Sequence, residues 1–169
     1  MFPDQAAQPT PSGETQARLM AELNSVRADF HELVATIREK DWERRPPGSE
    51  WTVRQIMYHL AMGQELFASG LGGARRSLSF TPPVTVGNRI NNVMTVWGAR
   101  RADGASIRRK FDRGHHRLAS ILSTVQAEEW GNRGVQNFRG RETVESTYGV
   151  VRAHFEEHAA DVRVVLAEH

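Results

Sequence analysis

The sequence contains no cysteine. This absence excludes a disulfide framework, a cysteine nucleophile and every zinc site that depends on thiolate ligands. It leaves the cellular compartment open.

A long hydrophobic run is also absent. No apolar stretch approaches the roughly 18 residues that suggest a membrane-spanning helix. Residues 1–14 contain three prolines and no hydrophobic core of a signal peptide. We therefore expect a soluble, cytoplasmic protein with no membrane partner, in which residues 1–14 form a disordered tail.

Lysine is scarce, since Lys40 and Lys110 are the only two in the chain and arginine supplies nearly all of the positive charge. The net charge is only +2. The arginine pairs are scattered among acidic residues and form no basic stripe, so we expect no nucleic-acid partner. We interpret the arginine content as codon bias of a GC-rich genome rather than as a functional signal.

The 169 residues fit a single domain, and their apolar residues recur mainly at helical spacing of three and four. No internal repeat and no convincing strand pattern interrupts this periodicity. We predict an all-α fold, an up-down four-helix bundle with one extra short helix, in residues 15–169. The helices are expected at about 15–40, 52–67, 87–101, 103–125 and 142 to near the end, separated by turns and loops at Arg45–Gly48, Gly70–Gly73, Pro82–Pro83 and Trp130–Gly140.

Two of these helices have recognisable starts. Thr52 and Gln55 match a capping box, in which each side chain bonds the backbone amide of the other residue. Asp103 is a suitable N-cap for the following helix.

The last predicted helix places His154 and His158 four residues apart, one turn above the other on the same face. They flank an apolar arc formed by Val144, Tyr148, Val151, Phe155, Val162, Val165 and Leu166. Two histidines at this spacing can hold a divalent metal, because both rings reach one point. They can equally be core histidines that bond to neighbours, and with seven histidines in the chain the spacing alone does not decide.

His59 adds to the metal interpretation, because it lies mid-helix in an apolar segment seven residues after the Thr52 cap. Three histidines from two facing helices give a site with open coordination positions, as in catalytic rather than structural centres. A lone core histidine satisfied by one hydrogen bond is the alternative.

The remaining histidines carry no such pattern. His115 and His116 are adjacent, point about 100° apart on a helix and resemble a solvated face. His31 has no evident partner, and His169 is terminal.

Two stretches of the sequence form a recognisable pattern together: Trp51-Thr52-Val53-Arg54-Gln55-Ile56-Met57-Tyr58-His59-Leu60-Ala61 and His154-Phe155-Glu156-Glu157-His158. In these residues the chain resembles the DinB-like superfamily, which includes damage-inducible DinB proteins, bacillithiol transferases and mycothiol-dependent maleylpyruvate isomerases. This resemblance implies a four-helix bundle that holds zinc or nickel on a histidine triad, here His59, His154 and His158. The isomerase branch often has a carboxylate at one of these positions, whereas all three are histidine in this chain. This difference slightly favours the transferase-like or uncharacterised branches.

The resemblance implies a metal-dependent enzyme that transfers a low-molecular-weight thiol to a small-molecule substrate, or a thiol-assisted isomerase, with a homodimer as a further expectation. Hydrolysis by activated water is the alternative, as is a non-catalytic stress-response protein whose metal is structural or absent. No general base stands out, since Glu157 is best interpreted as a solvated helix residue. Arg54, Arg89 and Arg152 are equal candidates for binding the carboxylates of a thiol.

Overall fold

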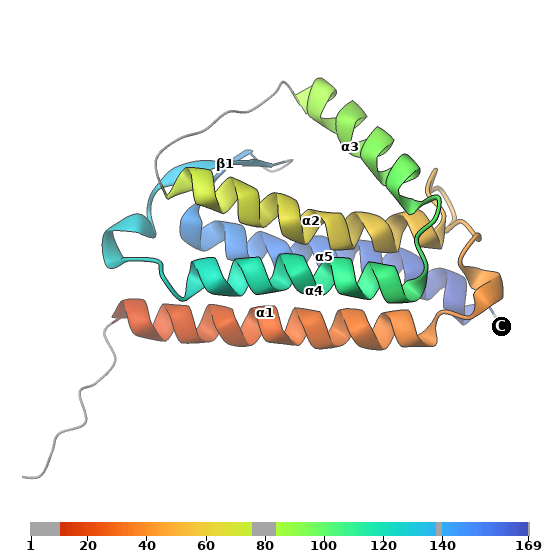
Figure 1. Ribbon diagram of the computed structural model, residues 1–169, viewed down its shortest axis with the longest axis horizontal. Coiled ribbons are helices and arrows are strands. Elements are labelled where there is room, and N and C mark those ends of the chain that lie inside the picture. Colours follow the sequence, from red (N-terminus) through yellow and green to blue (C-terminus); the bar gives the residue numbers. More distant parts are fainter. Residues whose placement is uncertain (1–10, 76–83, 138–139, 169) are drawn as a thin grey trace, which may run out of the picture.

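A computed structural model describes residues 11–75, 84–137 and 140–168. Within these residues the chain forms α-helices, two short 3-10 helices and a two-stranded hairpin (Figure 1). In chain order the elements are α1 (Pro11–Thr36), η1 (Glu39–Asp41), α2 (Val53–Ala74), α3 (Val84–Ala99), α4 (Gly104–Leu122), η2 (Ala127–Glu129), β1 (Arg133–Asn137), β2 (Gly140–Thr143) and α5 (Val144–Ala167). Helix α1 begins inside the predicted tail of residues 1–14, and residues 1–10 lie outside the described part.

The helices α1, α2, α4 and α5 lie side by side and form the predicted four-helix bundle, with α3 against its outside (Figure 1). The core between them is almost entirely apolar. Its largest fully buried side chains are Tyr148, Phe30, Phe111, Phe155, Leu19, Ile56, Met57, Leu60, Leu71, Ile107, Leu118 and Leu122. The all-α class is confirmed. No helix in the described ranges combines the length and apolar character needed to cross a bilayer.

The long helices do not simply alternate in direction along the chain. Arg54, in the first turn of α2, donates to the carbonyl of Ala102 just before α4. Arg75, at the end of α2, donates to the Thr124 hydroxyl just after α4, at 2.8 Å. Start therefore meets start and end meets end, so α2 and α4 run parallel. The chain returns along the bundle through the segment that contains α3 (Figure 1).

Helix α1 runs antiparallel to α4. Gln16 near its start donates to the carbonyl of Leu122 at 2.6 Å, and Arg27 bonds Asp112 at 2.7 Å. Helix α5 runs antiparallel to α2, because Trp51, just before α2, lies beside His158, whereas Phe67, further along α2, lies beside the earlier His154. Helices α1 and α2 are therefore antiparallel to each other, and so are α4 and α5. The segment that contains α3 joins these two halves of the bundle as a crossover.

Both predicted helix starts are confirmed. The Thr52 side chain accepts from the Gln55 amide, and the Gln55 side chain accepts from the Thr52 amide at 2.9 Å. Asp103 accepts from the Ser106 amide at 2.7 Å, and Ser106 completes a second box. These bonds satisfy amides that have no partner within the helix, and they fix where α2 and α4 begin.

Two predictions for glycine-containing segments were wrong, one of a helix break and one of an irregular loop. The predicted break at Gly70–Gly73 is helical, because Leu71 and Ala74 are fully buried and their packing outweighs the low helix propensity of glycine. The segment Trp130–Gly140, predicted to be irregular, contains most of the antiparallel β1–β2 hairpin. The loop predicted at Pro82–Pro83 lies outside the described residues.

Helix α3 is amphipathic, but its polar side faces the bundle and its apolar side faces outward. Its side toward α2 carries small and polar residues, with Thr95 and Ala99 buried and Gly98 so close to Tyr58 that a Cβ atom would clash. Its outer side exposes Val86, Ile90, Val93, Met94 and Trp97. We call these five residues the outer face of α3. The helix starts at Val84, a few residues before the predicted start at about residue 87.

Candidate metal centre

The middle of the α2–α5 interface brings together the three histidines singled out from the sequence. His59 comes from the second turn of α2, and His154 and His158 come from successive turns of α5. Capping at Thr52 fixes the register of α2, so His59 faces α5 rather than solvent. His59 and His154 are both only 7% exposed, and His158 is half-buried.

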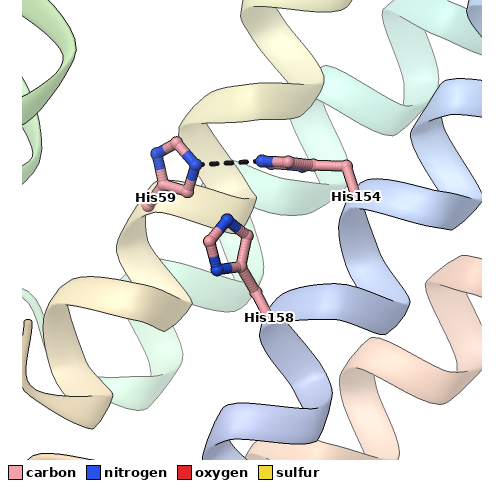
Figure 2. A group of neighbouring side chains, drawn as sticks. All are labelled: His59, His154 and His158. Carbon is pink, nitrogen blue, oxygen red and sulfur yellow. Dashed lines mark hydrogen bonds between the residues drawn. The ribbon is translucent and has the colours of Figure 1, made fainter. Parts of the chain in front are cut away.

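The three imidazole rings form a nearly regular triangle. Each pair of ring centroids is 4.9 Å apart, and the planes are steeply inclined to one another. One ring nitrogen from each residue falls in a group whose members all lie within 4.8 Å of one another. The Nε2 atoms of His59 and His154 are 2.9 Å apart and share a hydrogen bond (Figure 2).

Burial keeps these rings neutral. It lowers the pKa of His59 to about 4, helped by the nearby His158, while Asn91 acts in the opposite direction. Burial likewise lowers the pKa of His154 to about 3, with further contributions from His59 and His158. The pKa of His158 is lowered by burial against the opposing charges of Glu157 and Asp161. At neutral pH all three rings therefore retain a nitrogen lone pair for a ligand.

The walls of the triangle are aromatic and closely packed. The Trp51 ring lies 4.8 Å from the His59 ring, and the Phe67 ring lies 5.6 Å from that of His154. Gly63 makes room for His154, since a Cβ atom there would lie 3.1 Å from the ring carbon Cε1. These neighbours were not identified from the sequence as parts of the site. Trp51 lies within the motif that carried the resemblance, whereas nothing in the pattern marked Gly63 or Phe67.

Carboxylates lie at the margin of the site. The Oδ2 atom of Asp161 is 3.9 Å from Nδ1 of His158, and Glu157 is exposed, as predicted for a solvated helix residue. In the described part of the chain, the group of converging ligands contains the three histidines and no carboxylate.

The other histidines differ from the predictions in two respects. His31 has a partner, because its Nε2 atom lies 2.8 Å from Oδ1 of Asp112 on α4. His115 is buried rather than solvated, while His116 is exposed as predicted. The α1–α4 contact buries one member of this pair, and adjacency in sequence could not reveal which. His169 lies outside the described residues.

The donor set fits a divalent metal. Zinc–nitrogen bonds of about 2.0–2.1 Å place two ligating nitrogens of a tetrahedral site about 3.3 Å apart. The observed ligand nitrogens all lie within 4.8 Å of one another, and the Nε2 atoms of His59 and His154 are 2.9 Å apart, so these separations bracket that value. Three neutral imidazoles suit zinc, nickel, iron and copper alike, so the ligands do not select one metal.

The fold and the site define a helical bundle with a buried cluster of three histidines between its second and last helices. A sequence model of the DinB superfamily matches residues 10–162, and the chain belongs to that superfamily. The family resemblance drawn from the sequence is therefore confirmed.

Solved structures share the fold. YfiT from Bacillus subtilis, described as a probable metal-dependent hydrolase with an unusual four-helix bundle topology, has a TM-score of 0.74 at 16% identity, covering 98% of this chain and 91% of that one. The mycothiol-dependent maleylpyruvate isomerase has a TM-score of 0.71 at 11% identity, covering 87% of this chain. This match spans only 60% of the isomerase chain. No curated protein matches the sequence.

Proposed function

We propose that the protein is a divalent-metal-dependent enzyme that uses His59, His154 and His158 as ligands for zinc or nickel. The convergence of three neutral imidazoles from two helices, two of them buried and one half-buried, supports this proposal most directly. A divalent cation at the point where the three rings converge would accept a lone pair from each of them. A site with three protein ligands also leaves a coordination position for a substrate.

The reaction that we propose is transfer of a low-molecular-weight thiol, of the mycothiol or bacillithiol type, to an electrophilic small molecule, or a thiol-assisted isomerisation. A bound divalent metal supplies the chemistry by lowering the pKa of a thiol to the point where the thiolate forms near neutral pH. A thiol activated in this way needs no separate general base. This agrees with a converging ligand group that, in the described chain, contains histidines alone.

The surrounding side chains can bind and orient the substrates. Trp51 and Phe67 provide apolar surfaces next to the ligand rings. Arg54 is held by Glu43, and Arg152 by Asp29 and Glu156.

Arg89, by contrast, is exposed on α3 and forms no ion pair with the described residues. Of the three arginines considered from the sequence, we therefore favour Arg89 for binding a carboxylate of the thiol.

Metal-dependent hydrolysis is the second candidate. The likeness to YfiT favours it, because that protein is described as a probable metal-dependent hydrolase and the match covers nearly all of both chains. A metal held by the same three histidines would then activate water instead of a thiol.

Metal analysis of protein purified without a histidine tag tests the site. We expect about one zinc or nickel ion per chain in the wild type and a large loss in His154→Ala, because two imidazoles bind far more weakly than three. His116→Ala, which removes an exposed histidine from α4, is the matched control and retains the metal. A metal-poor wild type, or equal metal in His154→Ala, would contradict the proposed triad and favour a non-catalytic protein.

The metal-loaded protein then distinguishes the reactions. We expect conjugation of an electrophile such as monochlorobimane with mycothiol, bacillithiol or glutathione, and loss of this activity in His154→Ala. Hydrolysis of activated esters or amides without any thiol would favour the second candidate.

A further inference from the structure

The inner side of α3 presents a polar group to the metal centre. Asn91 is half-buried on this side, and its Oδ1 atom is buried with no hydrogen-bond partner among the described residues. The Nδ1 atom of His59 is buried and unpartnered in the same sense. Two unsatisfied polar atoms of opposite capacity at one helix contact are unusual, because each costs free energy when it is left alone.

The two residues are neighbours across the contact between α2 and α3. The Asn91 amide lies close enough to the His59 ring to oppose the lowering of its pKa by burial, although no hydrogen bond joins the two side chains as they stand. Within the triangle the His59 Nε2 atom faces His154, while its other ring nitrogen points away from the cluster (Figure 2). An amide oxygen that approaches the ring from outside the cluster therefore has Nδ1 as its natural partner.

The next residue of α3, Asn92, bonds the Trp51 ring on the same side of the site. Asn92 Oδ1 accepts from Trp51 Nε1 at 2.8 Å, and the Trp51 ring lies 4.8 Å from that of His59. Of these two consecutive asparagines, Asn92 bonds the aromatic ring that packs against His59, and Asn91 lies beside the His59 ring itself. The reverse amphipathicity of α3 places this polar side against α2.

Ring tautomers make the Asn91 contact consequential. A neutral histidine carries one ring proton, and the nitrogen that lacks it is the one that binds a metal. A ligand histidine commonly donates its other N–H to an oxygen acceptor, which fixes the tautomer and the ring orientation. With the proton on Nδ1, the His59 Nε2 atom has a free lone pair and accepts the 2.9 Å bond from His154 in the metal-free protein.

We propose that Asn91 is a positioning residue for the metal centre: its Oδ1 atom accepts the Nδ1–H of His59 and keeps Nε2 of that ring free for the metal. Its effect on metal binding rests on the proposed function, whereas the tautomer that it selects is a property of the metal-free protein. Helix α3 is then part of the site rather than only a connection between the two halves of the bundle.

The tautomer is measured first, by long-range ¹H–¹⁵N NMR of the histidine rings in metal-free protein, with His59→Gln used to assign the His59 signals. We expect the Nδ1–H form of His59 in the wild type and in Asn88→Ala, an exposed asparagine of the same helix that serves as control. Asn91→Ala should give a mixture of both forms, and Asn91→Asp should restore the Nδ1–H form. A wild-type His59 in the Nε2–H form overturns the proposal without any variant.

Metal affinity is measured next, by competition with a chromophoric chelator for Zn²⁺. We expect Asn91→Ala to bind about 10–100-fold more weakly, Asn91→Asp to recover most of the affinity, and Asn88→Ala to match the wild type. A merely structural role would not be rescued by aspartate, and thermal unfolding followed by circular dichroism reports any loss of folding. Unchanged affinity and tautomer in Asn91→Ala would refute the role of Asn91. A wild type that binds no zinc would refute the proposed function, while the tautomer would still decide the Asn91 contact.

Discussion

A ring nitrogen can bind a metal only when it carries no proton. Burial disfavours the charged, doubly protonated form of His59 and His154, so one nitrogen of each ring stays free of a proton. Their pKa values are lowered to about 4 and about 3, mainly because the charged rings would lose their hydration. A third ring of the same kind lies 4.9 Å away, so charging any one ring also raises the cost of charging the next.

The metal-free protein should consequently lose stability in mild acid. In the unfolded chain these histidines titrate near pH 6.5, so between pH 6.5 and pH 4 the unfolded state binds more protons than the folded state. The free energy of unfolding therefore falls as the pH is lowered through this window, by several kcal/mol for the two rings together. Urea unfolding of chelator-treated protein at a series of pH values measures the slope.

His154→Leu serves as the comparison for this pH dependence, because it removes one of the two titrating rings. The variant should show a shallower loss of stability between pH 6.5 and pH 4. A wild-type stability that stays flat across that window would contradict the buried, neutral state of the rings.

The three histidines could be predicted from the sequence because helix periodicity alone places His154 and His158 on one face, and the Thr52 cap fixes the register of His59. Asn91 and Gly63 could not be predicted in this way. Each acts across a helix contact, and the contact depends on how α3 and α5 pack on α2 rather than on local spacing.

At the scale of the single helix, α2 shows how tertiary packing overrides local propensity. Its last turns contain glycines that predicted a break, yet the helix continues to Ala74 because buried Leu71 and Ala74 pack into the bundle. The β1–β2 hairpin was missed for a related reason. Its short strands, within residues 133–143, carry no clear alternation of apolar and polar side chains, so the local sequence does not predict that they pair.

Glycines within α2 have different tasks, and this difference can be tested. Gly63→Ala should weaken zinc binding by about tenfold or more, because the new methyl group presses on the His154 ring, whose Cε1 atom would lie 3.1 Å away. Gly72→Ala is the matched control, since a Cβ atom there meets nothing within 4 Å. It should leave the affinity unchanged and stabilise the protein by about 0.5–1 kcal/mol. Equal affinities for the two variants would mean that His154 moves aside without consequence for the site.

For the whole molecule, the bundle could be predicted but the directions of its helices could not. Counting helices and short connections favours simple alternation, whereas a crossover that contains another helix allows α2 and α4 to run parallel. Gly114 permits the close approach of these helices, as a Cβ atom there would lie 2.9 Å from the backbone of Gln64 and Glu65. A single glycine in the sequence does not reveal which helix it faces.

The outer face of α3 bears on the predicted homodimer, which stays a prediction. Contiguous exposed apolar residues commonly mark interaction sites, and one such face on two copies can pair about a two-fold axis. We expect light scattering after size-exclusion chromatography to give a dimer for the wild type and a lower mass for Trp97→Glu, which charges a side chain that is 64% exposed. Val164→Glu alters an exposed apolar residue on α5 instead and should remain dimeric. A monomeric wild type would refute the expectation.

The distance along the chain between the two halves of the metal centre sets an order of events during synthesis. His154 follows His59 by 95 residues, which a ribosome adds in on the order of 5–20 s. Until α5 has emerged and packed against α2, a nascent chain offers a cation one histidine of the three. In the proposed centre, metal binding by all three histidines therefore follows translation of α5, and a loaded centre would show that α5 has packed against α2.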